Sequence, residues 1–349
     1  MLASKNNIHH SLLEYIKENP SSSSKQIHNA FVKKVSYATT KRLLQKFVAE
    51  HLIITQGQGK ATTYIISHSF EVLHHINVNT YFEKEIDERR IKTGFNFSLI
   101  KKTLGKLNYF TDAEVKHLNA LQQEYKNNIS KLSKSEYSKE LERLAIDLSW
   151  KSSQIEGNTY SLLETEKLLK EKETASGKTR DEATMLLNHK AALDFIIQNP
   201  NYIKPLTVSN IEDIHSLLIK ELGIERNVRK RRVGISGTNY RPLDNEYQIK
   251  EALEDMCILV NKQKDVFAKA LLVLILLSYI QAFSDGNKRT ARIISNAILI
   301  NNKFCPISFR TVDSIEYKKA MLIFYEQNNI SSFKQIFISQ FEFAVKTYF

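Results

Sequence analysis

The chain has 349 residues and a formal net charge of +12, from 50 lysines and arginines against 38 aspartates and glutamates. A hydrophobic fraction of 42% with only 10 glycines and 5 prolines excludes a disordered or collagen-like chain and predicts a mainly helical, globular protein of two or three domains. The positive charge suits an anionic partner such as a nucleotide or nucleic acid, although solubility alone explains much of it.

Cysteine usage and hydropathy exclude two further classes. Cys257 and Cys305 lie far apart with no paired spacing, so we expect neither a disulfide framework nor a metal knuckle. The longest apolar stretch, Ala270 to Ile280, is well short of the ~18–20 residues that cross a bilayer. No basic head followed by an apolar core opens the chain. We therefore expect a cytoplasmic protein without a membrane partner.

The N-terminal region has the pattern of a small domain. Helices are predicted at His10–Glu18, at Ser24–Phe31 and from Ser36, the last two opening with a serine at a capping position. Two β-rich runs, Leu52–Thr55 and Thr62–Ile66, flank a glycine-containing loop, which is typical of a hairpin. Three helices followed by a hairpin resemble the winged-helix DNA-binding fold.

We assign residues 1–70 to this winged helix-turn-helix domain. The resemblance places its third helix toward a DNA major groove and the hairpin loop near phosphates. The candidate DNA-contacting residues are Tyr37, Thr39, Thr40, Lys41, Lys46 and Lys60. Many winged helices bind proteins instead, and a lysine-bearing face is usually just solvated, so the sequence leaves binding to double-stranded DNA open.

Residues 71–130 are charged and helical, and we interpret them as a connector without chemistry of its own. A helix is predicted over about 135–157, because apolar residues share one face and Gly157 is a C-terminal stop signal. Glu156 lies in the last turn of that helix, where the macrodipole disfavours negative charge, so we expect it to have a cationic partner. Ser161 to Glu164 then indicates a capping box for the next helix.

Residues 227–242 are punctuated by glycines and alternate in character, which predicts a β-hairpin. A basic cluster, Arg229 to Arg232, lies just before its tip. Taken alone, this cluster suits nucleic acid as well as a docked substrate or nucleotide.

The most informative stretch is Gln281–Arg292, which lies between two apolar segments and therefore predicts a loop feeding the first turn of a buried helix. Asp285, Gly286 and Asn287 favour a tight turn that exposes backbone N–H groups. Such a turn at the start of a helix is an anion site.

Three cations, Lys288, Arg289 and Arg292, follow in the first turn of that helix. The macrodipole disfavours positive charge there, and the i,i+3 and i,i+4 spacings place the cations side by side. The arrangement requires a compensating anion. A polyphosphate fits best, with Asp285 holding Mg²⁺ between phosphate and protein. The alternative is that the cations pair with carboxylates elsewhere on a solvated helix.

These residues also carry a resemblance to a known family. The chain contains the run Phe283-x-Asp285-Gly286-Asn287-Lys288-Arg289-x-x-Arg292. This run resembles the signature of the Fic family, His-x-Phe-x-(Asp/Glu)-Gly-Asn-(Gly/Lys)-Arg-x-x-Arg. Members of that family mostly transfer AMP from ATP to hydroxyl side chains of proteins. The resemblance implies an all-helical Fic core with a β-hairpin flap over residues 131–349, preceded by the winged-helix domain.

The resemblance also implies roles for individual positions. Asp285 resembles the Mg²⁺ ligand, and Arg289 and Arg292 resemble the groups that steady the β and γ phosphates of ATP. The implied nucleotide-binding set is Phe283, Asp285, Gly286, Asn287, Lys288, Arg289 and Arg292. The implied catalytic positions are Gln281, Asp285, Asn287 and Arg289.

One position departs from the family pattern. Gln281 stands where the family has its catalytic histidine, the general base that takes the proton from the target hydroxyl. A neutral glutamine cannot take up that proton, and loss of a positioned base costs about 10²–10⁴ in rate. Lys288 is a second variation, because many AMP transferases have glycine there, whereas the Doc branch, which transfers phosphate, also has lysine.

Two other stretches resemble elements of the family. Ser152-x-x-x-Glu156-Gly157 resembles its inhibitory motif, which implies that Glu156 pairs with Arg292 and blocks the γ-phosphate of ATP. The hairpin at 227–242 resembles the flap that clamps a target segment by strand addition. The implied flap residues are Val233, Gly234, Ile235, Ser236, Gly237 and Tyr240.

The sequence thus supports a leading hypothesis and two alternatives. The leading one is a protein adenylyltransferase that uses ATP and Mg²⁺, acts on an unidentified protein target, is self-inhibited by Glu156 and is weakened by Gln281. The first alternative is a catalytically inactive, nucleotide-binding regulator that binds DNA through the winged helix. The second is a Doc-like phosphotransferase, which Lys288 suggests. The oligomeric state, including a homodimer, stays open.

Overall fold

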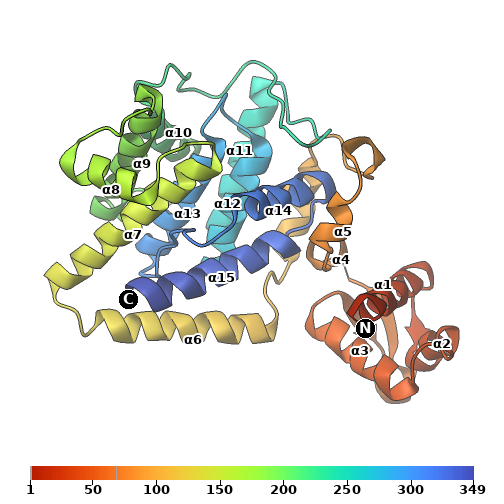
Figure 1. The fold of residues 1–349 in the computed structure, drawn as a ribbon. Coiled ribbons are helices and arrows are strands. Elements are labelled where there is room, and N and C mark those ends of the chain that lie inside the picture. The colour runs from red at the N-terminus through yellow and green to blue at the C-terminus, as the bar shows by residue number, and fades with distance from the viewer. Residues whose placement is uncertain (1, 68) are drawn as a thin grey trace. The chain divides into compact units, whose positions relative to one another are not determined.

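The computed structural model describes residues 2–67 and 69–349, with side chains from Ile8 onward, and divides them into two compact units. The first unit contains the chain up to His75 together with Lys106–Lys116, and the second contains Ile76–Gly105 and His117–Phe349. Figure 1 draws the N-terminal helices of the first unit in red and orange. The residues that we interpreted as a connector, 71–130, are divided between the two units.

The first unit combines helices with a small antiparallel sheet. Its helices are α1 (Leu2–Glu18), α2 (Ser24–Ala30), α3 (Tyr37–Ala49) and α4 (Phe70–Leu73). Its strands are β1 (Ser22–Ser23), β2 (Ile53–Gln56) and β3 (Thr63–Ile66), in the spatial order β1-β3-β2. A single 3₁₀ turn, Gly59–Ala61, lies in the loop of the β2–β3 hairpin.

Local signals place the helices of this unit. Ser36 caps α3 by accepting a hydrogen bond from the backbone of Thr39. The cap of α2 is Ser23, not Ser24, and it forms a capping box with Gln26. Ser23 also belongs to β1, which pairs with β3. This strand of two residues is too short to leave a periodic pattern, and the sequence did not indicate it.

The second unit is helical. Its helices are α5 (Val78–Phe82), α6 (Asp112–Ile129, which begins in the first unit), α7 (Lys134–Ile155), α8 (Leu162–Glu171), α9 (Arg180–Gln198), α10 (Val208–Leu218), α11 (Glu246–Lys262), α12 (Val266–Ile280), α13 (Asn287–Asn301), α14 (Ser314–Gln327) and α15 (Ser331–Tyr348). Short turns of other helical types occur at Ile86–Glu88, Leu99–Thr103 and Leu104–Lys106.

The paired helices α12 and α13 form the centre of this unit (Figure 1). Every side chain of α12 from Ala270 to Ile280 is buried, so the helix needs apolar neighbours on all sides. Helices α11, α13, α14 and α15 pack against it. Helix α13 also contacts α7, α9 and α10, and this packing brings three separate parts of the chain to the start of α13.

The flap segment, which we define as residues 227–242, differs from the predicted hairpin. It has a turn at Ser236 and Gly237, where Gly237 has φ +87°, but its two arms form no ladder with each other. Their hydrogen bonds go elsewhere. The amide of Arg229 donates to Ala282, and the amide of Arg241 donates to Thr93 at 2.8 Å. The arms are therefore fixed to the helical unit instead of to each other.

Residues 76–105 support the flap segment from outside. Arg89 donates to the carbonyl of Gly237 at 2.8 Å, and its guanidinium lies 3.2 Å from the carboxylate of Glu326 on α14. Both side chains of this ion pair are buried, at 3% and 0% exposed. Tyr81 also donates to Glu326, at 2.5 Å. These residues therefore hold the flap turn against α14, although we interpreted them from the sequence as a connector without chemistry of its own.

No helix in the described part of the chain is both long enough and apolar enough to cross a membrane.

The buried Arg89–Glu326 pair predicts that losing its cation lowers the stability of the protein far more than losing the cation of an exposed pair. Arg89→Met leaves Glu326 buried without its cation, so we expect the free energy of unfolding to fall by about 3–5 kcal/mol. Lys101→Met is the matched control, because Lys101 and its partners Glu251 and Asp255 are 40%, 52% and 22% exposed, so we expect a much smaller loss. Urea denaturation of both variants measures the difference. Equal losses would contradict the bracing role of Arg89.

Candidate functional site

The loop between α12 and α13 is shaped by the residues at its two ends. Helix α12 ends at Gln281, which adopts the left-handed conformation with φ +51°, and Gly286 begins α13 with φ +81°. A Cβ atom on residue 286 would lie 3.3 Å from the imidazole ring of His215. Backbone conformation and available space therefore both favour glycine at this position.

The side chain of Asn287 holds this loop from inside. Its Nδ2 donates to the carbonyl of Phe283 at 2.8 Å and to Oε1 of Gln281 at 3.2 Å, while its Oδ1 accepts from the amide of Phe283 at 2.9 Å. Because the side-chain amide is engaged in these contacts, the group that Asn287 offers to a ligand is its backbone N–H.

The start of α13 has no capping side chain. The other helices of the second unit from α7 to α12 each have one, supplied by Ser133, Ser161, Thr179, Thr207, Asn245 and Asp265. The first backbone N–H groups of α13 have no acceptor within the helix, and the positive end of the macrodipole lies beside them. An anion at this position satisfies both.

The three cations of the first turns pair with two carboxylates. Lys288 Nζ lies 3.2 Å from Oε2 of Glu156, and Arg292 Nη2 lies 2.8 Å from Oε1 of the same carboxylate. Arg289 Nη2 lies 3.1 Å from Oδ2 of Asp285. The predicted side-by-side packing of cations is thus partly compensated within the protein, and one positive charge of the cluster is left over.

Arg289 has donors without acceptors. Its side chain is 1% exposed, and its Nε and Nη1 atoms are buried without a hydrogen-bond partner among the described residues. A buried, unpaired donor on a charged group is costly, at about 1–3 kcal/mol or more. Its carboxylate partner Asp285 is 61% exposed, so the site is open to solvent on that side. The arrangement suits an anionic ligand.

Glu156 reaches these cations from the end of α7. The amides of Gly157 and Asn158 donate to the carbonyls of Gln154 and Ser153, which is the Schellman pattern of a helix C-terminus, and Gly157 has φ +103°. This ending directs the side chain of Glu156 toward α13. Glycine is required at residue 157 because of its backbone conformation alone, since a Cβ there meets nothing within 4 Å.

Electrostatics keep Glu156 ionised. Its side chain is only 17% exposed, and burial by itself raises the pKa of a carboxyl. The neighbouring charges of Arg292 and Lys288 outweigh burial, and the pKa of Glu156 is lowered from its ordinary value. Ser152 completes the contact, because Arg292 donates to its hydroxyl at 2.8 Å and to its carbonyl at 2.9 Å. The structure thus brings Ser152, Glu156 and Arg292 together.

Gln281 is fixed in place but has no ionisable group. Its Nε2 donates to the carbonyl of Ser278 at 2.6 Å, and its Oε1 accepts from Asn287. Its left-handed backbone, with φ +51°, is a conformation that histidine adopts more readily than most residues.

His215 on α10 belongs to the site although no pattern in the sequence pointed to it. Its ring stacks on Phe283 with centroids 3.7 Å apart, and its Nε2 lies 3.0 Å from the carbonyl of Asp285. Its Nδ1 lies 3.1 Å from the carbonyl of Arg226, at the entry to the flap segment. Burial is the main cause that lowers the pKa of His215. A lone histidine on an amphipathic helix resembles any core residue, so only the packing identifies it.

Arg229 is the second residue whose role the sequence did not indicate. Its side chain is buried and donates to three backbone carbonyls, those of Gln281 (2.6 Å), Arg231 (2.7 Å) and Leu243. It lies at the C-terminal end of α12, where the macrodipole favours a cation. One guanidinium thereby links the first arm of the flap segment, and Leu243 just after the second arm, to the backbone of residue 281. The sequence placed Arg229 in a basic cluster that suits nucleic acid as well as a docked substrate or nucleotide, whereas its side chain is buried.

The predicted flap residues differ in exposure. Gly234, Ser236 and Gly237 are exposed, and Val233 and Ile235 are half-buried, so this run is accessible. Tyr240 is 2% exposed, stacks on Tyr279 and donates to its carbonyl at 3.1 Å. Tyr240 is therefore an anchor of the flap segment and does not face a ligand.

Asp285 is the exposed carboxylate that could hold a metal ion at this site. No group of three or more metal-binding side chains occurs in residues 2–67 and 69–349. Asp285 is exposed and accepts from the amide of Gly286 at 2.6 Å. Mg²⁺ commonly takes one or two carboxylates and fills its other positions with water and phosphate oxygens. The residues therefore fit a Mg²⁺ ion that arrives with a phosphate ligand, and not a dedicated protein cage.

The predicted DNA-contacting residues of the first unit are also unequal. Tyr37 is 40% exposed, Lys41 lies over its ring at 5.4 Å, and Lys46 and Lys60 are exposed. Thr40, by contrast, is 0% exposed and hydrogen-bonds to the carbonyl of Ser36. The expectation that Thr40 faces a groove is therefore corrected, because the helix turns its hydroxyl inward.

The chain is similar to proteins of one known family. Residues 205–299 match the Fic/DOC family. A protein adenylyltransferase Fic from Nematostella vectensis is 30% identical over 175 residues, and protein adenylyltransferase fic-1 from Caenorhabditis elegans is 26% identical over 171 residues. The matches cover 48% and 47% of this chain, but only 40% and 33% of those relatives. The chain thus spans well under two thirds of their length.

Solved structures show the same fold. A Fic-1 structure from Caenorhabditis elegans superposes with a TM-score of 0.59 at 20% identity, covering 68% of this chain and 72% of that one. A Fic family protein from Desulfovibrio desulfuricans gives 0.57 at 19% identity, with 68% and 74% covered. At these identities the likeness establishes the helical fold and not the chemistry.

Proposed function

The chain carries a Fic/DOC-family domain over residues 205–299, and on this premise we propose that the second unit binds ATP with Mg²⁺ and transfers AMP to a hydroxyl group of a protein target. The observation that carries the proposal is the buried guanidinium of Arg289, whose Nε and Nη1 lack partners in the described structure. It lies at the uncapped start of α13. A polyphosphate supplies acceptors for these donors and for the free backbone N–H groups. The names of the matching relatives support AMP as the transferred group.

In this proposal Glu156 keeps the protein self-inhibited. Its carboxylate engages Arg292 and Lys288, two cations that a terminal phosphate would otherwise bind. A γ-phosphate and Glu156 carry the same sign of charge and compete for the same donors. Productive ATP binding therefore requires Glu156 to withdraw, whereas ADP has no γ-phosphate and is spared this competition.

Asp285 holds Mg²⁺ in the proposal, together with oxygens of the nucleotide. The ion supplies positive charge that neutralises the phosphates and the leaving group. Arg289 Nη2 lies 3.1 Å from this carboxylate, so the metal ligand and the phosphate-binding guanidinium are neighbours in the proposed site.

The transfer step demands a proton acceptor. The target oxygen attacks the α-phosphorus, the bond to the bridging oxygen breaks, pyrophosphate leaves, and the hydroxyl proton must go to a base. Gln281 can orient the hydroxyl but cannot take its proton. We therefore expect slow AMP transfer. A nucleotide-binding regulator without catalysis is the first alternative, and phosphate transfer of the Doc kind, suggested by Lys288, is the second.

The target docks on the accessible run Val233–Ser236 of the flap segment in this proposal. Within the described residues, the backbone of this run makes no hydrogen bond to another backbone group. Free N–H and C=O groups on an extended chain are what a target strand pairs with. Arg229 fixes the start of the flap segment and Arg89 fixes its turn, so the docking run between them is preorganised.

We propose a DNA-binding role for the first unit, which would then be a winged helix. Exposed cations on one helix support it, since Lys41 and Lys46 on α3 and Lys60 in the hairpin loop are exposed. Two buried free cysteines, Cys257 and Cys305, further support a reducing, cytoplasmic setting.

Removal of the Arg289 charge tests the nucleotide site. Arg289→Met keeps the volume but loses charge-assisted hydrogen bonds worth about 1.5–3 kcal/mol, so we expect ATP affinity to fall about 10- to 150-fold by calorimetry in Mg²⁺. Because Asp285 is 61% exposed, its loss of a partner should not unfold the protein. Arg180→Met, at an 85% exposed arginine, is the charge-matched control. Unchanged affinity for Arg289→Met would remove the basis of the proposal.

Restoring a base tests the chemistry. Gln281→His should increase label transfer to protein by about 10²-fold or more if the base alone is missing. Incubation with ATP labelled at the α-phosphate reports AMP transfer, and label at the γ-phosphate reports phosphate transfer. No gain with either label, while ATP still binds, would favour the regulator.

Salt dependence tests the first unit. In full-length protein, Lys41→Gln and Lys46→Gln should each weaken binding to duplex DNA and reduce the slope of log affinity against log salt by about 0.9 per lost phosphate contact. Lys17→Gln, at an exposed position of α1, is the control. Equal effects from all three variants in a mobility-shift titration would refute a specific DNA face on α3.

A further inference from the structure

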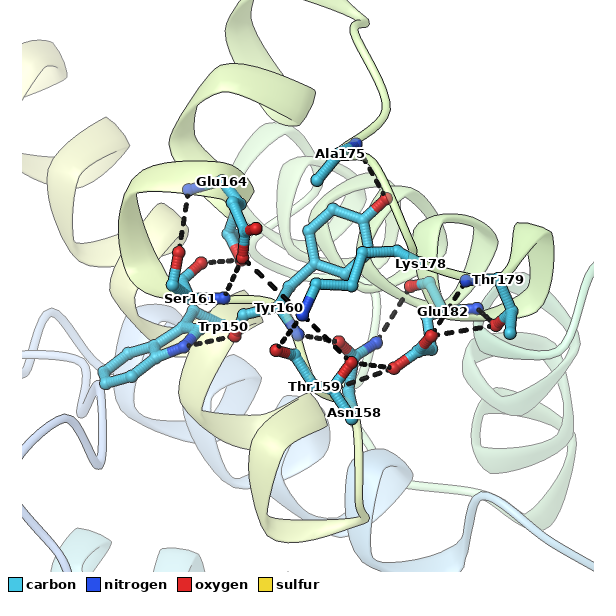
Figure 2. A network of polar contacts seen from close by, with 11 residues as sticks. Trp150, Asn158, Thr159, Tyr160, Ser161, Glu164, Ala175, Lys178, Thr179 and Glu182 are labelled. Carbon is cyan, nitrogen blue, oxygen red and sulfur yellow. Dashed lines mark hydrogen bonds and ion pairs between the residues drawn. The ribbon is translucent and has the colours of Figure 1, made fainter.

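The chain that follows Glu156 is fastened to the start of α9, as Figure 2 shows. Asn158 Nδ2 donates to the carbonyl of Glu182 at 2.9 Å, and Trp150 Nε1 on α7 donates to the carbonyl of Tyr160 at 3.0 Å. Lys178 Nζ donates to the carbonyl of Thr159 at 2.6 Å. The turn that follows α7 is therefore held in place by hydrogen bonds to neighbouring segments.

The carboxylate of Glu182 is the centre of this attachment (Figure 2). Its Oε1 accepts from the amide of Thr159 at 2.8 Å and from the Thr159 hydroxyl at 2.6 Å. Its Oε2 accepts from the amide of Thr179 at 2.9 Å and from that hydroxyl at 3.0 Å. A single carboxylate thus takes part in the capping box of α9 and also accepts hydrogen bonds from the turn after α7.

These donors stabilise the charged form of Glu182. The hydrogen bonds from Thr159 and Thr179 lower the pKa of Glu182 to about 2. A depressed pKa means that the contribution of these bonds is present above the ordinary carboxyl pKa and is lost as the pH falls toward 2. The attachment is therefore constant over the neutral range, and its strength depends on the charge of one residue.

We propose that Glu182 is a positioning residue for the inhibitory contact, which it maintains by holding the turn at residues 157–161 and with it the last turn of α7. This inference rests on the proposed function, because it assigns Glu182 a part in the competition between Glu156 and the γ-phosphate. Helix ends fray most readily, and Glu156 lies at such an end. The ion pairs of Glu156 with Arg292 and Lys288 form only while that end stays in place.

Calorimetry with ATP and with ADP, both in Mg²⁺, separates this role from a general structural one. Glu182→Gln removes the charge but keeps the shape, and we expect ATP affinity to rise about three- to tenfold while ADP affinity stays within about twofold. A loss of structure would weaken both nucleotides. Thr159→Val, which removes one donor from the other side of the contact, should move the ATP to ADP ratio in the same direction.

Glu136→Gln is the matched control. Glu136 has the same place in a capping box, at the opposite end of α7. Its carboxylate accepts a hydrogen bond from Ser133 and, within the described part of the chain, none from a second segment. We expect it to leave both nucleotide affinities unchanged. In a Glu156→Gly background, Glu182→Gln should add nothing, because the contact that it positions is gone.

The outcomes are distinguishable. If Glu156→Gly raises ATP affinity and Glu182→Gln and Thr159→Val do not, the positioning role of Glu182 is refuted and the proposed function stands. The same holds if Glu182→Gln weakens ATP and ADP equally. If neither nucleotide binds to the wild type or to Glu156→Gly, the proposed function fails and this inference fails with it.

Discussion

The second unit depends on how it compensates the positive start of α13. Arg289 and Arg292 are buried beside the positive end of a helix macrodipole, and no side chain caps that end. Such an arrangement is stable only if negative charge comes from elsewhere. Glu156 supplies it from α7, so charge as well as packing holds α7 against α13.

The loop beside this cluster is supported by hydrogen bonds to backbone carbonyls. Arg229 donates to backbone carbonyls, and His215 lies between the carbonyls of Asp285 and Arg226. Asn287 uses its amide in the same way. None of these contacts brings another carboxylate next to Arg289. The loop is thus held in shape without neutralising the charge that an anionic ligand would meet.

Binding and chemistry are separable in this chain. The groups that suit a polyphosphate are backbone amides and arginines, and they do not require a residue that titrates near neutral pH. The chemistry would require one at position 281, where a glutamine is held by Ser278 and Asn287. Control of access is a third component of the proposed function: Glu156 contacts the cations, while Glu182, on another helix, bonds to the turn that follows Glu156.

Local patterns in the sequence determined several helices and helix ends, because caps and stop signals act within a few residues. Ser36, Gly157 and Gly286 are such cases, and the cluster Lys288, Arg289 and Arg292 predicted an anion site because charge and helix position oppose each other there. Tertiary structure alone decided which partners meet. His215, Arg229 and Glu182 look ordinary in the sequence, and their roles arise from contacts between residues as much as 70 positions apart. The flap arms likewise bond to the helical unit instead of each other, since long-range acceptors compete with the local hairpin ladder and no local pattern records them.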